Sequence, residues 1–385
     1  MTMENTTPAT GRKSQRLLSL DILRGMTVAG MILVNNGFGE SFETLRHSKW
    51  NGMTPCDLVF PFFLFIMGIS CYLSLSKSRF TASGPVLFKI LKRSALLFAI
   101  GLFINWFDHA IEGDLLCFGH LRIWAVMQRI ALCYFFVSMF ALYCSHRYIL
   151  HTVVGLLVVY TLILLLGNGY AEDASVNILA QADLQIFGYD HLYHKSPVDP
   201  EGLVGTISGV AHVLLGFYCG RLIKLHDTIG EKALAVFALG AVCVIVGYLL
   251  SFGLPLNKRI WSPSYVFMTC GLCALLQALL IKKEARPSVE SDRPEGWGSQ
   301  KGLSLWGRLE GAFRVFGVNA LALYVGSELL AILFSQFGIS TVIYNALHAV
   351  IPAAKWASLA YALTFVAINY LLGYILWRRK IFIKL

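Results

Sequence analysis

Charge is what this sequence most lacks. Only 14% of its 385 residues are Asp, Glu, Lys or Arg, whereas 56% are hydrophobic. A soluble domain carries about 25% charged residues. The deficit extends over the whole length, which excludes a soluble domain with a single membrane anchor. The composition therefore predicts a polytopic membrane protein.

The patterns of disulfide-bonded, zinc-binding and secreted proteins are also missing. Eight of the nine cysteines fall within or at the ends of hydrophobic stretches and only Cys117 lies in a loop, so we expect no disulfide framework. Cys270 and Cys273 lack a partner pair, and His191 and His194 match no zinc spacing, so we expect no metal site. Residues 1–16 are polar, and the apolar run after them is too long for a cleavable signal peptide. We expect the first span to act as a signal anchor.

What the sequence does contain is a series of long hydrophobic stretches. A membrane-spanning helix needs about 20 apolar residues. By that criterion we predict an all-α protein with about ten transmembrane helices, forming a single domain over residues 1–385. The spans are expected near 18–38, 54–75, 88–107, 121–144, 147–169, 202–224, 232–252, 260–281, 312–335 and 354–377. The remaining segments are a polar tail over 1–16, an outer loop over 170–201 and a linker over 282–311.

The distribution of lysine and arginine predicts the orientation in the membrane. With ten spans both termini lie on one side, and that side carries 22 of the cations against seven on the other. Cytoplasmic loops hold the excess of such residues, so both termini are predicted to be cytoplasmic. The net charge of +10 is explained by this topology and does not indicate nucleic-acid binding.

Five ionisable or polar residues are predicted to share one depth near the outer surface. They are Asn35, His47, Asp57, Arg129 and Glu328. Charges at that depth should face the bundle interior and pair, because lipid does not solvate them. One reading is that they form structural ion pairs between helices. The other is a reactive site, in which His47 serves as general base, since imidazole exchanges a proton near neutral pH.

A second polar cluster is predicted at the cytoplasmic edge. Asp21 and Arg24 lie three residues apart on the first span, and Lys92 and Arg93 begin the third. These cations could bind phosphates or could be ordinary positive-inside anchors. From Asp21 to Asn35 a helix extends about 21 Å. A ligand that touches both clusters would be long, anionic at one end and reactive at the other, as coenzyme A thioesters are.

Several motifs resemble a known family. They are Ser-Leu-Asp-x-Leu-Arg-Gly at 19–25, His-x-x-Trp-Asn-Gly at 47–52, Asp-Leu-Val-Phe-Pro-Phe-Phe-Leu-Phe-Ile-Met-Gly at 57–68, Gln128-Arg129, Asp199-Pro200-Glu201-Gly202, Leu256-Asn257-Lys258 and Gly317-Val318-Asn319. Together they are similar to the heparan-α-glucosaminide N-acetyltransferase family and its bacterial branch. One departure is Trp124-Ala125, where family members tend to have Pro-Gly.

The resemblance implies transfer of acetyl from cytoplasmic acetyl-CoA to the amine of a glucosamine-type sugar at the outer side. It assigns to His47 the role of general base or acetyl carrier, and to Asn35 or Asn36 that of an assisting amide. Asp57 would orient His47 or hold the ammonium of the acceptor. Trp50 would stack on the sugar. The expected substrate-binding residues are Trp50, Asn51, Arg129, Asp199, Glu201 and Glu328, and the expected acetyl-CoA-binding residues are Asp21, Arg24, Lys92, Arg93 and Gln128. The resemblance also implies a bacterial inner membrane, contact with lipid and a homodimer.

Two alternatives to an enzyme follow from the same residues. In a transporter of N-acetylglucosamine or a related amino sugar, the outer polar cluster would be a substrate site and His47 a proton-coupling group. Against this, the sequence shows no internal repeat and no charge network at the midplane. A scaffold without chemistry would leave the buried charges unexplained. Dependence on acetyl-CoA would distinguish the acetyltransferase from both the transporter and the scaffold.

Overall fold

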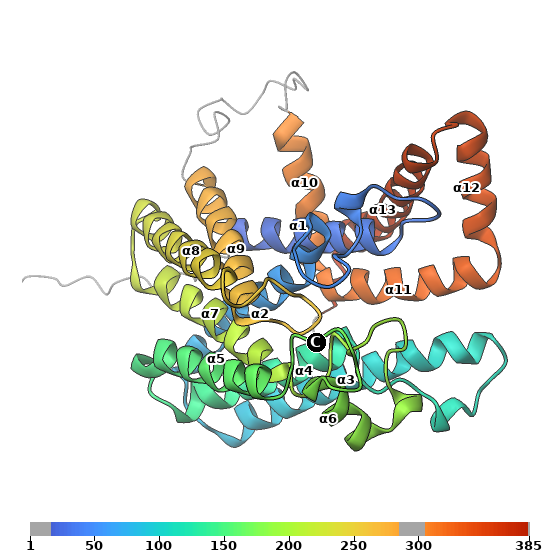
Figure 1. The fold of residues 1–385 in the computed structure, drawn as a ribbon. Coiled ribbons are helices and arrows are strands. Elements are labelled where there is room, and N and C mark those ends of the chain that lie inside the picture. Colours follow the sequence, from blue (N-terminus) through green and yellow to red (C-terminus); the bar gives the residue numbers. More distant parts are fainter. Residues whose placement is uncertain (1–16, 285–304, 384–385) are drawn as a thin grey trace, which may run out of the picture.

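The computed structural model describes residues 17–284 and 305–383, and within them the regular structure is entirely helical (Figure 1). This confirms the all-α prediction. The longer helices in the first half are α1 (Leu18–Asn35), α2 (Val59–Leu75), α3 (Gly84–Ile111), α4 (Val126–Tyr143), α5 (Ile149–Leu166) and α7 (Thr206–Leu225). Those in the second half are α8 (Ile229–Ser251), α9 (Pro263–Glu284), α10 (Leu305–Val318), α11 (Ala320–Gln336) and α13 (Ala354–Arg378). Two shorter helices are α6 (Ile178–Phe187) and α12 (Ile339–Val350).

The number of spans differs from the prediction of ten. In the described ranges, eight helices are long and apolar enough to cross a membrane, or nine if α10 and α11 together form one span. The polytopic class is thus confirmed. The third predicted span, near 88–107, corresponds to α3, which is not among these helices. Its 28 residues include Lys89, Lys92 and Arg93 near the start and Asp108 near the end, so the uncharged part is confined to residues 94–107. That part is about 21 Å long, shorter than the hydrocarbon core.

The prediction of one continuous helix over 312–335 was wrong. α10 and α11 meet at Asn319 with a bend of 84°, and in Figure 1 α10 stands upright against the nearly horizontal α11. The Asn319 side chain donates to the carbonyl of Ile381 at 3.0 Å and accepts from the amide of Ile383 at 3.0 Å. The segment after α13 therefore fastens the corner. Hydropathy alone did not reveal the bend, because the residues on both sides of it are apolar.

Two of the predicted connecting segments contain more structure than expected. The outer loop over 170–201 includes α6, whose first turn is capped by the side chain of Asn177 accepting from the amide of Leu179 at 2.9 Å. The linker over 282–311 is shorter than predicted, because α9 continues to Glu284 and α10 begins at Leu305. The predicted polar tail over 1–16 and the middle of the linker lie outside the described residues.

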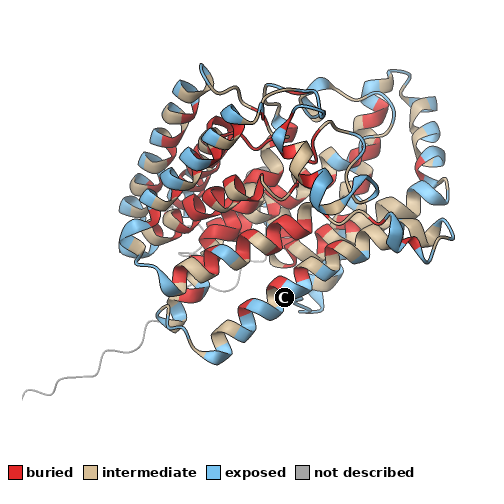
Figure 2. Ribbon diagram, turned by 60° about the horizontal axis from the view of Figure 1, so that its bottom comes forward, coloured by how far each residue is buried: buried red, intermediate tan, exposed pale blue. Residues whose placement is uncertain are grey.

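Burial separates central helices from peripheral ones. In α7, 72% of the membrane-length window is buried, whereas the corresponding share is 28% in α5, α8 and α13. Figure 2 shows the buried residues concentrated in the middle of the bundle and the exposed ones on the outer helices. We infer that α5, α8 and α13 expose apolar faces to lipid. Lipid tails are as apolar as these side chains, so the helices need not bury them inside the protein.

Glycines allow the central helices to cross at close range. A Cβ atom added at Gly68 of α2 would lie 2.2 Å from the carbonyl oxygen of Val213 on α7, and one at Gly317 of α10 would lie 1.9 Å from that of Asp21 on α1. Small residues at crossings are the usual means of helix association in membranes, because dispersion contacts replace the hydrophobic effect there. The α1–α10 crossing lies beside Arg24, so it also fixes the helix that carries this predicted acetyl-CoA-binding residue.

Gly317→Ala is therefore expected to destabilise the protein by about 1–3 kcal/mol, because the added methyl group must push the α1 backbone away. Gly311→Ala is the matched control on the same helix, since no residue of the described ranges lies within 4 Å of a Cβ atom there. Thermal unfolding of both variants in detergent measures the difference. Equal midpoints for the two variants would show that the α1–α10 contact is looser than described.

Candidate active site

Asp57 is held in place by the start of the second span. The chain enters α2 through a short 3-10 helix, Pro55–Leu58, and Thr54 forms a capping box with Asp57. The Asp57 carboxylate accepts from the amides of Thr54 at 3.0 Å and Ser48 at 3.1 Å, and from the Thr54 hydroxyl at 3.1 Å. Its side chain is fully buried. The spacing Thr-x-x-Asp with Pro55 at the first helical position is the sequence signal for this arrangement.

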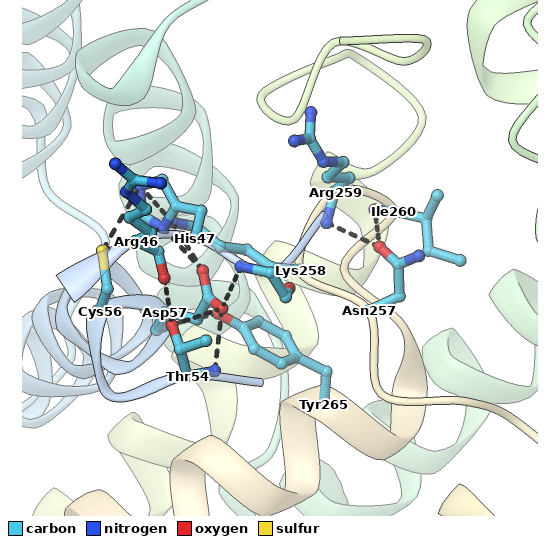
Figure 3. Close-up of polar contacts among 11 residues, drawn as sticks. Arg46, His47, Thr54, Cys56, Asp57, Asn257, Lys258, Arg259, Ile260 and Tyr265 are labelled. Carbon is cyan, nitrogen blue, oxygen red and sulfur yellow. Dashed lines mark hydrogen bonds and ion pairs between the residues drawn. The ribbon is translucent and has the colours of Figure 1, made fainter. Parts of the chain in front are cut away.

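His47 contacts Asp57 and is partly exposed (Figure 3). Its Nδ1 atom lies 2.7 Å from Asp57 Oδ1, while 48% of its side chain is exposed. If Nδ1 carries the proton and donates to the carboxylate, Nε2 keeps its lone pair and can accept a proton. The pair is thus arranged to present a basic nitrogen to a ligand. This is the orientation that the prediction for these two residues requires.

Lys258 completes this cluster, a position that was not predicted from the sequence. Its Nζ atom lies 3.0 Å from Nδ1 and 3.3 Å from Nε2 of His47, and 3.6 Å from Asp57 Oδ1. Only 13% of its side chain is exposed. The motif Leu256-Asn257-Lys258 contributed to the family resemblance, so the signal was present, but no periodicity related this loop to His47.

The Lys258 loop is docked onto the His47 loop by backbone and amide contacts. The amide of Gly52 donates to the carbonyl of Leu256 at 2.7 Å, and Asn257 donates to Asn51 Oδ1 at 3.2 Å. Asn257 also accepts from the amides of Arg259 at 2.8 Å and Ile260 at 3.2 Å, which fixes the turn. Asn51, predicted to bind substrate, is therefore placed at the junction of the two loops.

Cys56 and Tyr265 border the same cluster. Cys56 Sγ is buried and lies 3.2 Å from His47 Nδ1. The Tyr265 hydroxyl, from α9, donates to the backbone carbonyl of Asp57 at 2.5 Å. Both residues are buried, so they shield the inner side of the cluster from water. The ionic interaction with Lys258 is consequently stronger than it would be in water.

Trp50 occupies a packed position beside the site. Its side chain is buried, and Nε1 donates to the carbonyl of Tyr170 at 3.0 Å. The ring belongs to a hydrophobic cluster that includes Tyr160, Leu164 and Ile260. In this conformation Trp50 anchors the His47 loop to the segment after α5, and its faces are covered by protein. The predicted stacking on a sugar does not follow from this placement.

Asn35 and Glu328 form a second polar pair. Asn35 is the last residue of α1, is exposed, and donates to Glu328 Oε1 on α11 at 3.2 Å. The neighbouring Asn36 is buried and donates to the carbonyl of Ile32 at 2.8 Å, within its own helix. Of the two asparagines left open by the sequence, Asn35 is the one whose amide is accessible.

Arg122, in the segment before α4, forms ion pairs with two carboxylates at the end of the outer loop. Arg122 donates to Asp199 at 2.9 Å and to Glu201 at 3.0 Å, and its guanidinium lies 4.4 Å from the centre of the Tyr193 ring. Asp199 and Glu201 were predicted to bind substrate, whereas Arg122 was counted only as an outer cation. Tyr324 on α11 is within electrostatic range of Arg122, Glu201 and Glu328.

Arg129 and Gln128 lie at the start of α4. Arg129 donates to the carbonyl of Gly202 at 2.9 Å and its guanidinium lies 5.2 Å from the centre of the Trp261 ring. Gln128 is fully buried against Gly101 of α3. In the described part of the chain, both amide atoms of Gln128 and two guanidinium nitrogens of Arg129 lack a hydrogen-bond partner. Gln128 thus belongs with the outer group and not with Asp21 and Arg24.

Asp183 is a further buried carboxyl, on α6. It accepts from the amide of Leu203 at 3.0 Å, and burial, only partly offset by this hydrogen bond, raises its pKa from 3.8 to about 6. A carboxyl whose pKa is higher in the folded than in the unfolded protein binds more protons when folded. Stability is therefore expected to fall as pH rises from about 4 to about 6.

Asp183→Asn is expected to remove this pH dependence and to raise stability at pH 7. The difference between 3.8 and about 6 corresponds to at most about 3 kcal/mol. Thermal midpoints measured between pH 4 and pH 8 for the wild type and the variant test this expectation. Parallel curves for the two proteins would contradict it.

The predicted acetyl-CoA-binding residues lie at the other end of α1. Arg24 contacts Asp21 Oδ1 at 3.2 Å and donates to Ser70 of α2 at 2.8 Å. Arg93 lies with its guanidinium 4.6 Å from the centre of the Tyr134 ring, and Lys92 is exposed. Two arginines thus reach into the bundle, while Lys92 lies at its surface. No cluster of three or more His, Cys, Asp or Glu side chains able to hold a metal occurs within residues 17–284 and 305–383.

Comparison with known proteins assigns the chain to a family. The family model described as "Heparan-alpha-glucosaminide N-acetyltransferase, catalytic" matches residues 16–224, more than half of the chain. The human heparan-alpha-glucosaminide N-acetyltransferase is 29% identical over 445 aligned residues, which cover 98% of this chain and 62% of the human protein. The mouse protein is also 29% identical, over 443 residues with the same coverages. The chain spans about three-fifths of the length of these relatives. It belongs to the heparan-alpha-glucosaminide N-acetyltransferase family.

Proposed function

We propose that this protein is a membrane N-acetyltransferase that moves the acetyl group of acetyl-CoA to the amine of a glucosamine-type sugar. The observation that carries the proposal is the contact between His47 and the buried Asp57, with 48% of the His47 side chain exposed. Family membership supports the reaction type, since the similar human and mouse proteins are named for it.

In the proposed reaction His47 removes a proton from the acceptor. The neutral amine attacks the thioester carbonyl carbon, Nε2 takes the proton that the attacking nitrogen loses as the carbon–sulfur bond breaks, and this proton passes to the coenzyme A thiolate. Asp57 holds the ring through Nδ1 and stabilises the charged imidazolium. The accessible Asn35 amide would donate to the carbonyl oxygen as it becomes negative.

The acceptor sugar would lie among the polar residues near His47. Glu328, Asp199 and Glu201 supply carboxylates that can accept from sugar hydroxyls, and Arg122 holds the latter two in place. Arg129 and Asn51 support the loops around this space, through Gly202 and Asn257 respectively. A monosaccharide is a suitable ligand, because a few polar side chains are enough to orient a small molecule of this size.

Acetyl-CoA would enter from the opposite end of α1, where Arg24 and Arg93 can bind phosphates. The two ends are separated by about 21 Å along α1. The pantetheine arm would extend between them, so that donor and acceptor approach from different sides of a bacterial inner membrane. In this scheme the end with Arg24 is cytoplasmic, as the charge distribution predicts.

Purified protein in detergent, supplied with radiolabelled acetyl-CoA and glucosamine, tests the proposal directly. Label should appear in N-acetylglucosamine, and only if both substrates are present. The alternative is a transporter of amino sugars, which the bend between α10 and α11 favours, because transporters often bind substrate at broken helices. If no label moves but N-acetylglucosamine crosses the membrane of proteoliposomes, the transporter reading replaces the enzyme.

A further inference from the structure

A primary amine of the protein itself occupies the position expected for the acceptor amine. Lys258 Nζ lies 3.3 Å from Nε2 and 3.0 Å from Nδ1 of His47, and 3.6 Å from the Asp57 carboxylate (Figure 3). In the proposed reaction the acceptor amine must also contact the base, and a neighbouring carboxylate would stabilise its ammonium form. The lysine therefore resembles the sugar amine in both chemistry and position.

The loop that carries Lys258 holds the amine there. Asn257, the preceding residue, is fully buried and fixed by hydrogen bonds to the His47 loop and to its own turn. The lysine side chain is only 13% exposed, so solvent competes weakly for its charge. These restraints keep Nζ within hydrogen-bond distance of the imidazole, which satisfies the proximity of amine and base that proton removal requires.

We propose that Lys258 is a site of self-acetylation when acetyl-CoA is bound and no acceptor sugar is present. The inference rests on the proposed function. His47 takes a proton from the Lys258 ammonium, the neutral Nζ attacks the thioester carbonyl carbon, and the carbon–sulfur bond breaks. His47 releases this first proton to solvent, takes the second proton from the attacking nitrogen and passes it to the thiolate, so that the products are acetyl-lysine, free coenzyme A and one proton.

Acetylation would switch the site off. The amide product has no positive charge, so Asp57 would lose its ionic interaction with Lys258, and the acetyl group would occupy the space beside His47. An amino sugar that binds at the same place would compete with Lys258 and protect it. Lys258 would then be modified mainly when acetyl-CoA is abundant and the acceptor is scarce.

Lys355 provides an internal reference in the same protein. It is 46% exposed and pairs with Glu40 at 3.4 Å, with no histidine in that ion pair. Because a positioned base accelerates proton transfer by about a hundredfold or more, Lys258 should be acetylated about a hundredfold faster than Lys355. Any uncatalysed reaction of lysines with acetyl-CoA is measured by Lys355.

The experiment incubates full-length protein in detergent with isotopically labelled acetyl-CoA and no sugar, followed by peptide mass spectrometry over time. We expect rapid labelling of Lys258, slowing of that labelling by glucosamine, and a fall to the Lys355 rate in His47→Ala. His47→Gln, which keeps a polar group beside Asp57, repeats the test if the alanine variant is unstable. Lys258→Arg keeps the charge and should lose the label.

Equal labelling of Lys258 and Lys355 in the wild type, or labelling of Lys258 that is unchanged in both His47 variants, would overturn the inference. The same samples, assayed with glucosamine, separate this failure from a failure of the proposed function. If the sugar is acetylated and Lys258 is not, only the inference falls. If neither is acetylated, the proposed function falls with it.

Discussion

Replacing His47 with alanine is expected to lower the turnover of acetyl transfer by about two to four orders of magnitude, the range that general-base catalysis contributes. The substitution removes the nitrogen that receives the acceptor proton and leaves Asp57 bonded to Ser48 and Thr54. Because half of the His47 side chain is exposed, its loss should change the thermal midpoint little. The rate of label transfer from acetyl-CoA to glucosamine measures the effect.

His151→Ala is the matched control for this variant. His151 is exposed on α5, where its ring contacts Tyr148, and it contacts no member of the proposed site. Its removal should leave turnover unchanged. Wild-type turnover in His47→Ala would contradict both direct transfer and transfer through an acetylated His47, because each requires the imidazole.

The second large effect is expected for Asp57→Asn. An asparagine has nearly the same shape but no charge, so it cannot stabilise the imidazolium, and its NH2 group would face the amides that now donate to the carboxylate. Turnover should fall by about two to four orders of magnitude. Stability should fall by about 3 kcal/mol, because Lys258 is left with a buried charge and no carboxylate.

A double variant distinguishes the electrostatic cause from a general disruption of the loop. Lys258→Met removes the ammonium and keeps the length of the side chain. If the ion pair accounts for the loss, Asp57→Asn/Lys258→Met should be more stable than Asp57→Asn alone, with coupling of about 1–3 kcal/mol. Strictly additive changes in the unfolding free energy would show that the two side chains do not interact.

The helical class, the polytopic character and the family were all accessible from the sequence. Long hydrophobic stretches identify spans reliably, because in lipid every backbone group must be bonded within a helix. The bend at Asn319 was not accessible in this way. It depends on hydrogen bonds to Ile381 and Ile383, which are distant in sequence and leave hydropathy unchanged.

The candidate site was predicted in part. His47 and Asp57 stood out because ionisable residues at a membrane surface are costly to retain. Lys258 and Arg122 did not stand out, since a lysine or arginine in an outer loop resembles any other exposed cation until tertiary contacts are known. Trp50 was assigned to the sugar from its residue type, whereas its environment is set by Tyr170, a contact across 120 residues.

The fastening of the α10–α11 corner by the segment after α13 has a consequence for biosynthesis. Asn319 leaves the ribosome 62 residues before Ile381, its partner. At about 5–20 residues per second, roughly 3–12 seconds of translation separate the two. During that interval α11 enters the membrane without the contact that fixes its angle to α10. The corner is therefore a late step in assembly, and the insertion machinery or neighbouring helices must hold the unfinished protein until it forms.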